Sequence, residues 1–243
     1  MRRVVRAFWG PRPESAEALA GRWKRTLDGI TALLPGAVPP GGATGAGGPW
    51  RQVHGTGPET ELPADEGALL GALRVAQAAE DWSDLTGTAL RLHRTDAPGL
   101  RTELSGLAGG APEFLLQSFV MTLHVPDGAE VPGADLLAVL AREWEPDFGD
   151  VSDDDVLDAL EDDAGYSVGD PVVGRAGYLS PGRAALVPGD LKAVREELPG
   201  GGVLLRIADA GADVTAEVVA AYERLRDAGA LDPLPRPMDR AVL

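Results

Sequence analysis

The densest charge in the chain lies between positions 143 and 170, which hold twelve acidic residues and no lysine or arginine. Carboxylates this close repel one another unless water or a cationic partner surrounds them. Three interpretations are open: a solvated acidic face, a docking surface for a basic protein, or a divalent-metal site. The triplet Asp153-Asp154-Asp155 lacks the alternate spacing, central glycine and terminal glutamate of a calcium loop, which disfavours the metal. We therefore expect no metal ion or other cofactor.

The start of this acidic region also carries two aromatic residues. Trp144-Glu145-Pro146-Asp147-Phe148-Gly149 sets Trp144 and Phe148 beside carboxylates in a segment shaped by proline and glycine. Such mixtures of aromatic and charged residues are typical of interface hot spots. The same aromatic side chains could equally anchor the hydrophobic core, in which case they would need no partner.

The histidines offer a second kind of chemistry. His54, His93 and His124 show no metal-binding spacing, but His93 and His124 lie on predicted strands and could converge in a small hydrolase or transferase site. No serine stands within Gly-x-Ser-x-Gly, and Gly200-Gly201-Gly202 precedes a strand, whereas phosphate-binding glycines open a helix. Histidines on polar strand faces or in cores are more common than catalytic pairs, so the enzyme is the alternative interpretation, and we expect no catalytic activity.

Composition narrows the class of partner. The formal net charge is −16, from 38 acidic and 22 basic residues, and the chain has no cysteine. This charge disfavours nucleic acid and anionic lipid as partners and would steer a basic protein toward the chain. The need for solubility alone could also explain the charge. No segment has the ~18 apolar residues of a membrane helix, and Arg6 interrupts any signal-peptide core, so we expect a soluble cytoplasmic protein.

The elements that must position these residues alternate irregularly. Periodicity predicts helices at 14–34, 65–80, 133–144, 188–198 and 213–228, and a brief helix capped by Ser152. It predicts strands at 3–9, 86–95, 114–125, 172–180 and 203–207. We expect one α+β domain over residues 1–243, with a mixed or antiparallel sheet packed against several amphipathic helices. A long Gly/Pro-rich loop at 35–63 and a surface tail at 233–243 complete the prediction.

Three motifs together resemble the immunity protein 52 family of bacterial polymorphic toxin systems. The first is Phe8-Trp9-Gly10-Pro11-Arg12-Pro13-Glu14-Ser15 with its following helix. The second is Trp144-Glu145-Pro146-Asp147, and the third is Gly177-Tyr178-Leu179-Ser180. The resemblance spans most of the chain but gives no signal between positions 35 and 63, and the third motif is one aromatic short.

The resemblance implies a small cytoplasmic protein that neutralises a cognate nuclease toxin, usually of restriction-endonuclease-like fold, by stoichiometric binding. A nuclease must expose Lys and Arg to bind phosphates, so an acidic inhibitor suits it. We place the contact surface in the acidic region. The expected toxin-binding residues are the anchors Trp144 and Phe148 and the carboxylates Asp147, Asp153, Asp154, Asp155, Asp158, Glu161 and Asp162.

Overall fold

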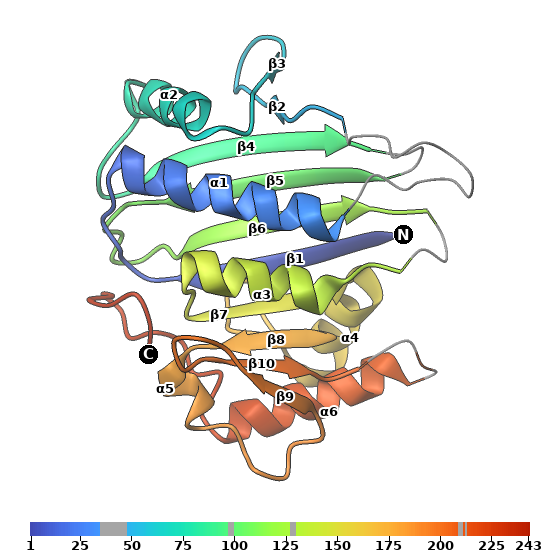
Figure 1. Ribbon diagram of the computed structural model, residues 1–243. Coiled ribbons are helices and arrows are strands. Elements are labelled where there is room, and N and C mark those ends of the chain that lie inside the picture. The colour runs from blue at the N-terminus through green and yellow to red at the C-terminus, as the bar shows by residue number, and fades with distance from the viewer. Residues whose placement is uncertain (35–47, 97–99, 127–129, 209–210, 212) are drawn as a thin grey trace.

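The computed structural model describes residues 1–34, 48–96, 100–126, 130–208, 211 and 213–243. Six helices and ten strands lie in this part of the chain (Figure 1). The helices are α1 (Ala16–Leu33), α2 (Glu66–Gln77), α3 (Gly133–Trp144), α4 (Asp154–Ala164), α5 (Pro181–Ala184) and α6 (Val214–Asp227). The strands are β1 (Arg2–Trp9), β2 (Arg51–Gln52), β3 (Thr60–Glu61), β4 (Thr88–Thr95), β5 (Arg101–Ala108), β6 (Gln117–His124), β7 (Phe148–Asp153), β8 (Ala176–Leu179), β9 (Val194–Glu197) and β10 (Val203–Arg206).

All ten strands join one sheet in the order β3-β2-β4-β5-β6-β1-β7-β8-β10-β9, and every neighbouring pair is antiparallel. The N-terminal strand β1 therefore lies in the interior of the sheet, between β6 and β7. This arrangement confirms the predicted α+β class. Of the two predicted kinds of sheet, mixed or antiparallel, the sheet is antiparallel.

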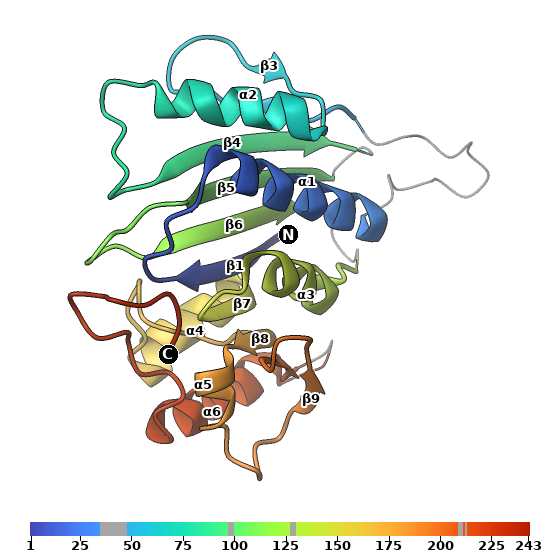
Figure 2. The ribbon, with the colours of Figure 1, turned by 60° about the vertical axis from the view of Figure 1, so that its left-hand side comes forward.

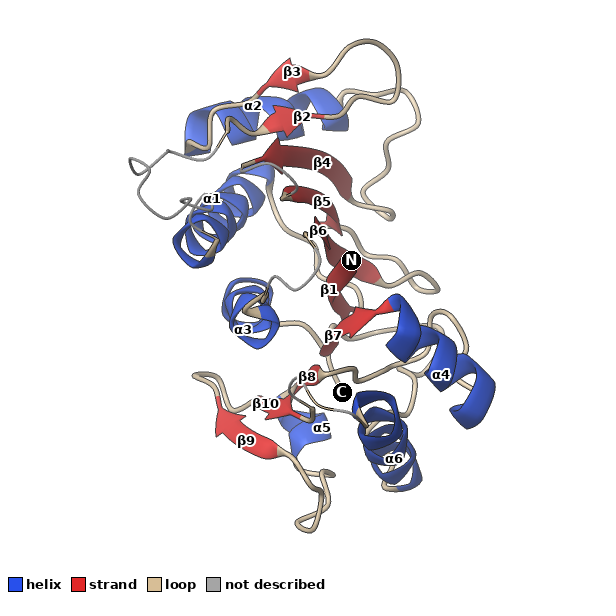
Figure 3. Ribbon diagram, turned by 90° about the vertical axis from the view of Figure 1, so that its right-hand side faces the viewer, coloured by secondary structure: helices blue, strands red, loops and turns tan. Residues whose placement is uncertain are grey.

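The helices divide between the two faces of the sheet. Helices α1, α2 and α3 cover one face, and α4 and α6 cover part of the other (Figure 3). Each face has its own hydrophobic cluster: Trp9, Trp23 and Trp144 belong to the first, and Phe148 and Tyr222 to the second. The alternation of side chains along each strand sends successive residues to opposite clusters.

Helices α4 and α6 leave half of the second face uncovered. They lie over the β7–β8–β10 end, whereas no described helix lies over β4, β5 and β6 on that side (Figure 3). The side chains of these strands that point away from α1 are largely polar. They are Ala89, Arg91, His93 and Thr95 of β4, Arg101, Glu103, Ser105 and Leu107 of β5, and Ser118, Val120, Thr122 and His124 of β6. We call these twelve residues the open sheet face.

Several local predictions need correction. Asp153, not Ser152, caps α4, because its carboxylate accepts from the Val156 amide at 3.1 Å. Residues 188–198 do not form a helix; their polar sequence ends in the exposed edge strand β9, which pairs with β10. Of the predicted loop at 35–63, positions 35–47 lie outside the described residues, and the remainder holds the short strands β2 and β3.

The predicted surface tail is tied to the fold. Leu234 and Met238 are buried, and the Ala241 carbonyl accepts from the Gly10 amide at 2.8 Å, which brings the tail beside the end of β1 (Figure 2). A Cβ on Gly10 would lie 2.2 Å from the Arg240 carbonyl oxygen. Glycine is thus required where β1 ends, because the tail crosses it closely.

Candidate functional site

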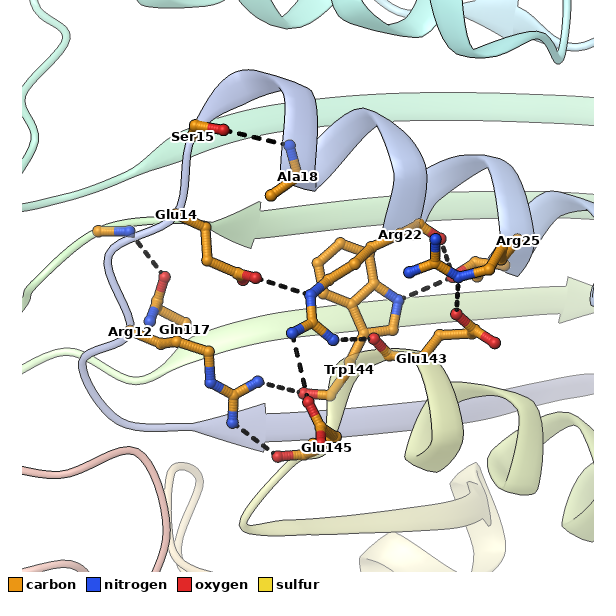
Figure 4. A network of polar contacts seen from close by, with 12 residues as sticks. Arg12, Glu14, Ser15, Ala18, Arg22, Arg25, Gln117, Glu143, Trp144 and Glu145 are labelled. Carbon is orange, nitrogen blue, oxygen red and sulfur yellow. Dashed lines mark hydrogen bonds and ion pairs between the residues drawn. The ribbon is translucent and has the colours of Figure 1, made fainter. Parts of the chain in front are cut away.

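The first two sequence motifs meet at one place between α1 and α3. The indoles of Trp9 and Trp144 stack with centroids 5.5 Å apart, and Trp144 Nε1 donates to Thr26 Oγ1 at 2.9 Å. Arg12 donates to the backbone carbonyls of Trp144 and Glu145 at the C-terminal end of α3 (Figure 4). These carbonyls have no partner within the helix, so the guanidinium caps it.

Arg22 and Arg25 of α1 extend this polar network. Arg22 bonds the carboxylate of Glu14 at 2.7 Å and also donates to the Glu143 carbonyl, while Arg25 pairs with the Glu143 carboxylate (Figure 4). Ser15 caps α1 through the Ala18 amide at 3.3 Å. Together these contacts fix α1 against α3. The N-terminal motif therefore holds two helices in place rather than presenting groups to a ligand.

The third motif joins the same region through a buried carboxylate. Asp147 is fully buried and bonds Arg183 at 2.7 Å, the Ser180 hydroxyl at 3.1 Å and the Leu243 amide at 2.8 Å. Ser180 ends the motif that includes Tyr178. Burial, reinforced by the carboxylates of Glu145 and Asp147, raises the pKa of Tyr178 from its ordinary 10.0 to about 12.

Four of the nine expected toxin-binding residues are wrong as surface contacts, because their side chains are buried. Trp144 stacks on Trp9, and Phe148 stacks on Phe8 with centroids 5.2 Å apart. Asp147 is enclosed by the bonds described above. Asp153 caps α4 and pairs with Arg175 at 2.7 Å. A partner at the surface of the fold meets none of them.

The other five residues lie together on the exposed side of α4. They are Asp154, Asp155, Asp158, Glu161 and Asp162, and Asp163 joins them. At 100° per residue, Asp154, Asp158 and Asp162 point most directly away from the buried Val156 and Leu160. We call the exposed carboxylates of residues 154–163 the α4 acidic face.

The acidic face is arranged against the preferences of an isolated helix. Carboxylates in the first turn suit the helix dipole, but Asp162 and Asp163 lie in the last turn, which holds no basic residue. Asp154 and Asp158, and Asp158 and Asp162, also stand four residues apart, where like charges repel. Asp154 pairs with Arg2 at 2.6 Å. In the part of the chain that the structure describes, the other carboxylates of this face have no ion-pair partner.

The two strand histidines lie on the open sheet face with a glutamate between them. His93 stands directly opposite Glu103 in the β4–β5 pair, and His124 Nε2 lies 3.7 Å from the Glu103 carboxylate. His93 Nε2 contacts Glu59 at 2.7 Å. Within the described chain neither ring bonds a hydroxyl that could serve as a nucleophile, so the arrangement gives the enzyme interpretation no support.

A hollow of about 380 Å³ lies at the N-terminal end of α1, lined by Ser15, Gln77, Trp82 and Leu85 among others. No group of three or more His, Asp or Glu in the described residues is placed to hold a metal ion. None of the described helices has the length and apolar character needed to cross a membrane.

Sequence reasoning missed the open sheet face as a surface. A signal exists in the alternation of polar residues along β4, β5 and β6. Strand β5 was not predicted, however, and without it β4 and β6 are not neighbours. The face appears only when Arg101 and Glu103 of β5 are placed between His93 and His124.

Comparison with known proteins gives the fold but no family. No family model matches the chain, and no curated protein matches it. Among solved structures, the chain is similar to the Pseudomonas aeruginosa T6SS protein PA0821, with a TM-score of 0.53 and 13% sequence identity. The likeness covers 95% of this chain and 73% of that one. At this identity the match shows a shared fold alone.

Proposed function

We propose that this chain is an immunity protein of a secreted-toxin system, which binds a cognate basic nuclease domain through the α4 acidic face. The binding is stoichiometric and involves no catalysis by this chain. By covering the Lys and Arg residues that the toxin uses for phosphate contacts, the protein would prevent nucleic acid from binding. The location of this encounter is the cytoplasm.

The observation that carries the proposal is the charge arrangement of α4. Acidic residues needed only for solubility have no reason to gather in the last turn of a helix, where the dipole opposes them. Asp162 and Asp163 lie there, and Arg226 of α6 bonds the Ala164 carbonyl at this end at 2.7 Å but pairs with neither carboxylate. A cationic partner would relieve the repulsion between Asp158 and Asp162.

Two further observations support the proposal. The net charge of −16 favours fast association with a basic partner over a long range. The fold is shared with a protein whose name places it in a T6SS. The three motifs that resemble the immunity protein 52 family form the joint between α1, α3 and β7, which is consistent with a fold signature.

The test is co-expression with a nuclease toxin domain, which the proposal expects to be encoded beside this gene. We expect cells that make both proteins to survive, and a one-to-one complex to elute from gel filtration at low salt. Continued killing together with separate elution would contradict the proposal. A nuclease of acidic net charge in that position would contradict the electrostatic part of it.

A further inference from the structure

Strand β9 ends the sheet with an exposed edge. No described element lies beyond β9 in the strand order, and all four residues of Val194–Glu197 are exposed (Figure 3). An unpaired edge presents free amides and carbonyls to which another strand can add, and proteins usually protect it with charges. The charges on β9 therefore need a closer look, because their signs determine which strands the edge repels.

The pairing with β10 shows which backbone groups of β9 are free. The Leu198 amide donates to the Gly202 carbonyl at 2.9 Å, which makes Leu198 a hydrogen-bonded position of the hairpin. Hydrogen-bonded positions alternate along an antiparallel pair, so every second residue before Leu198 also bonds β10. The amides and carbonyls of Arg195 and Glu197 lie at the positions between and point outward. These four groups can form hydrogen bonds with an added strand.

The side chains at the same two positions carry opposite charges. Arg195 and Glu197 stand opposite Leu205 and Val203 of β10, so both lie on the side of the sheet that α6 covers. Neither side chain forms an ion pair within the described part of the chain. An unpaired arginine and an unpaired glutamate two positions apart are complementary to the same strand running in the opposite direction.

The other side of β9 offers an apolar contact. Val194 is 67% exposed, and Leu198 lies on the same side at the edge of the first hydrophobic cluster. In two antiparallel β9 strands centred on Glu196, Val194 of each copy stands opposite Leu198 of the other. The two Glu196 carboxylates then meet at the centre. Arg206 lies 3.6 Å from Glu196 within each copy and offsets their repulsion.

Three antiparallel registers bring the outward groups of two β9 strands together, and one of them suits the chain. Placing Arg195 opposite Glu197 of the other copy forms four backbone hydrogen bonds and two ion pairs. A shift in one direction sets Arg195 against Arg195 and needs the Ala193 amide, which already donates to the Leu191 carbonyl at 2.9 Å. A shift in the other direction sets Glu197 against Glu197 and needs an amide hydrogen that Pro199 lacks.

The charge around β9 lets two copies approach each other. Residues 188–208 hold three acidic and three basic residues, so this stretch is neutral in a chain of net charge −16. Helix α4 with its acidic face contacts β7 and lies away from β9 (Figure 3). At physiological salt the Debye length is about 8 Å, so the repulsion between the distant acidic surfaces is largely screened.

We propose that two copies of this chain pair through β9, with Arg195 of each copy opposite Glu197 of the other. The two-fold axis is perpendicular to the sheet and passes between the two Glu196 residues. The sheets therefore join edge to edge, and the interface is isologous and closed. Only five residues of each strand take part, so the dimer is weak, with a dissociation constant on the order of 10–100 µM.

The test uses the full chain alone and three charge variants. Sedimentation velocity from about 10 µM to about 1 mM should show a concentration-dependent dimer of the wild type. R195E and E197R each set like charges against each other in both cross-strand pairs, so each should raise the dissociation constant about tenfold. R195E/E197R restores opposite charges and should dimerise as the wild type does. An equimolar mixture of R195E and E197R should form mixed dimers, since each pair then joins opposite charges.

The matched control is K192E, which makes the same change in net charge as R195E at an exposed residue outside the paired segment. It should dimerise as the wild type does, and circular dichroism checks that every variant is folded. Hydrogen exchange gives a second measurement on the wild type. The Arg195 and Glu197 amides should exchange more slowly at high concentration, whereas the Glu196 amide should not change, because it already bonds β10.

Four results would each overturn the proposal. They are a wild-type chain that is monomeric at about 1 mM, an R195E variant no weaker than K192E, a mixture of R195E and E197R without mixed dimers, and outward amides whose exchange does not depend on concentration.

This inference goes beyond the proposed function, and its test needs no toxin. Pairing through β9 leaves the α4 acidic face exposed on both copies, so R195E should bind the toxin as the wild type does. A monomeric wild-type chain that binds the toxin would contradict the dimer alone. A dimer that binds no toxin would contradict the proposed function alone.

Discussion

The indole of Trp9 stacks on that of Trp144 at a centroid distance of 5.5 Å and an interplanar angle of 23°. Residues 135 positions apart in the sequence thus form one aromatic pair, in which Trp9 ends β1 and Trp144 ends α3. The edge of Trp23 meets the Trp144 ring at 5.9 Å, which brings α1 into the same contact. The pair joins the sheet to the two helices that cover its first face.

Replacing Trp144 should therefore affect stability before it affects binding. We expect W144A to lower the free energy of unfolding by about 3–5 kcal/mol, because a fully buried indole leaves a cavity. Urea denaturation would measure the change. The control is W82A. Trp82 is 37% exposed, so its replacement should lower the free energy of unfolding much less. A W144A protein of normal stability with weakened toxin binding would return Trp144 to the interface.

The buried ion pair between Asp147 and Arg183 should respond differently to single and double substitution. D147A leaves a buried guanidinium without its partner, so we expect a loss of about 3–5 kcal/mol. Replacing both residues with apolar ones of similar volume, as in D147L/R183M, should recover much of that loss, because neither charge then has to be desolvated. Thermal unfolding of the two variants would compare their losses of stability. Equal losses would mean that Asp147 acts through Ser180 and Leu243 instead.

Tyr178 should make the protein sensitive to alkaline pH. Burial first, then Glu145 and Asp147, raises its pKa from 10.0 to about 12 in the folded state. The unfolded chain releases this proton at lower pH than the folded one. The free energy of unfolding is therefore unaffected below pH 10 and falls as the pH rises from there toward 12. Denaturant unfolding across this range should show a smaller decrease for Y178F than for the wild type. Parallel decreases would contradict the assignment.

The two ends of α4 should respond with opposite signs to loss of a negative charge. D163N removes a carboxylate from the last turn and should stabilise the protein, whereas D155N removes one from the first turn and should destabilise it. Each effect is on the order of 0.5 kcal/mol. Thermal melts at low salt would measure both, and high salt should reduce the difference. Stabilisation by both substitutions would indicate general charge repulsion instead of the helix dipole.

Most of the helices were predictable because their signals are local, although no helix forms at 188–198 and α5 was not predicted. Helix α3 has the predicted bounds, and α1 begins at the Ser15 cap within two residues of the predicted start. The apolar spacing of each helix reflects the face that it buries. Gly10-Pro11 correctly marks the end of β1, although the contact that requires Gly10 comes from the distant tail.

The missed strands depend on distant partners. Strand β7 contains Asp150, whose charge is typical of a loop, although the structure buries it fully. Arg6 of β1 makes this burial possible by donating two hydrogen bonds of 2.9 Å to the Asp150 carboxylate. Strand β5 contains Gly106, which suggests a break. A Cβ there would lie 2.6 Å from the Trp23 ring, so the glycine makes room for α1.

The candidate site was half predictable for the same reason. Charge alone located the acidic region, and the exposed residues of α4 lie within it. Burial of Trp144, Asp147, Phe148 and Asp153 follows from contacts with Trp9, Arg183, Phe8 and Arg175, which no local pattern reveals.

The central claim is that the α4 acidic face binds a basic toxin domain. The most direct measurement is the association rate constant with the purified nuclease domain, by stopped flow at low salt. Three chains are compared: the wild type, D155N/D158N/D162N, and the matched variant E17Q/D28N/E66Q on the opposite face. Both variants lose three negative charges, so any general effect of net charge is the same in each.

We predict that the α4 variant associates about tenfold more slowly than the matched variant, because charges at the contact dominate electrostatic steering. The difference should disappear at high salt, and both variants should remain folded. Equal association rates for the two variants would contradict the account and place the toxin on another surface of the fold.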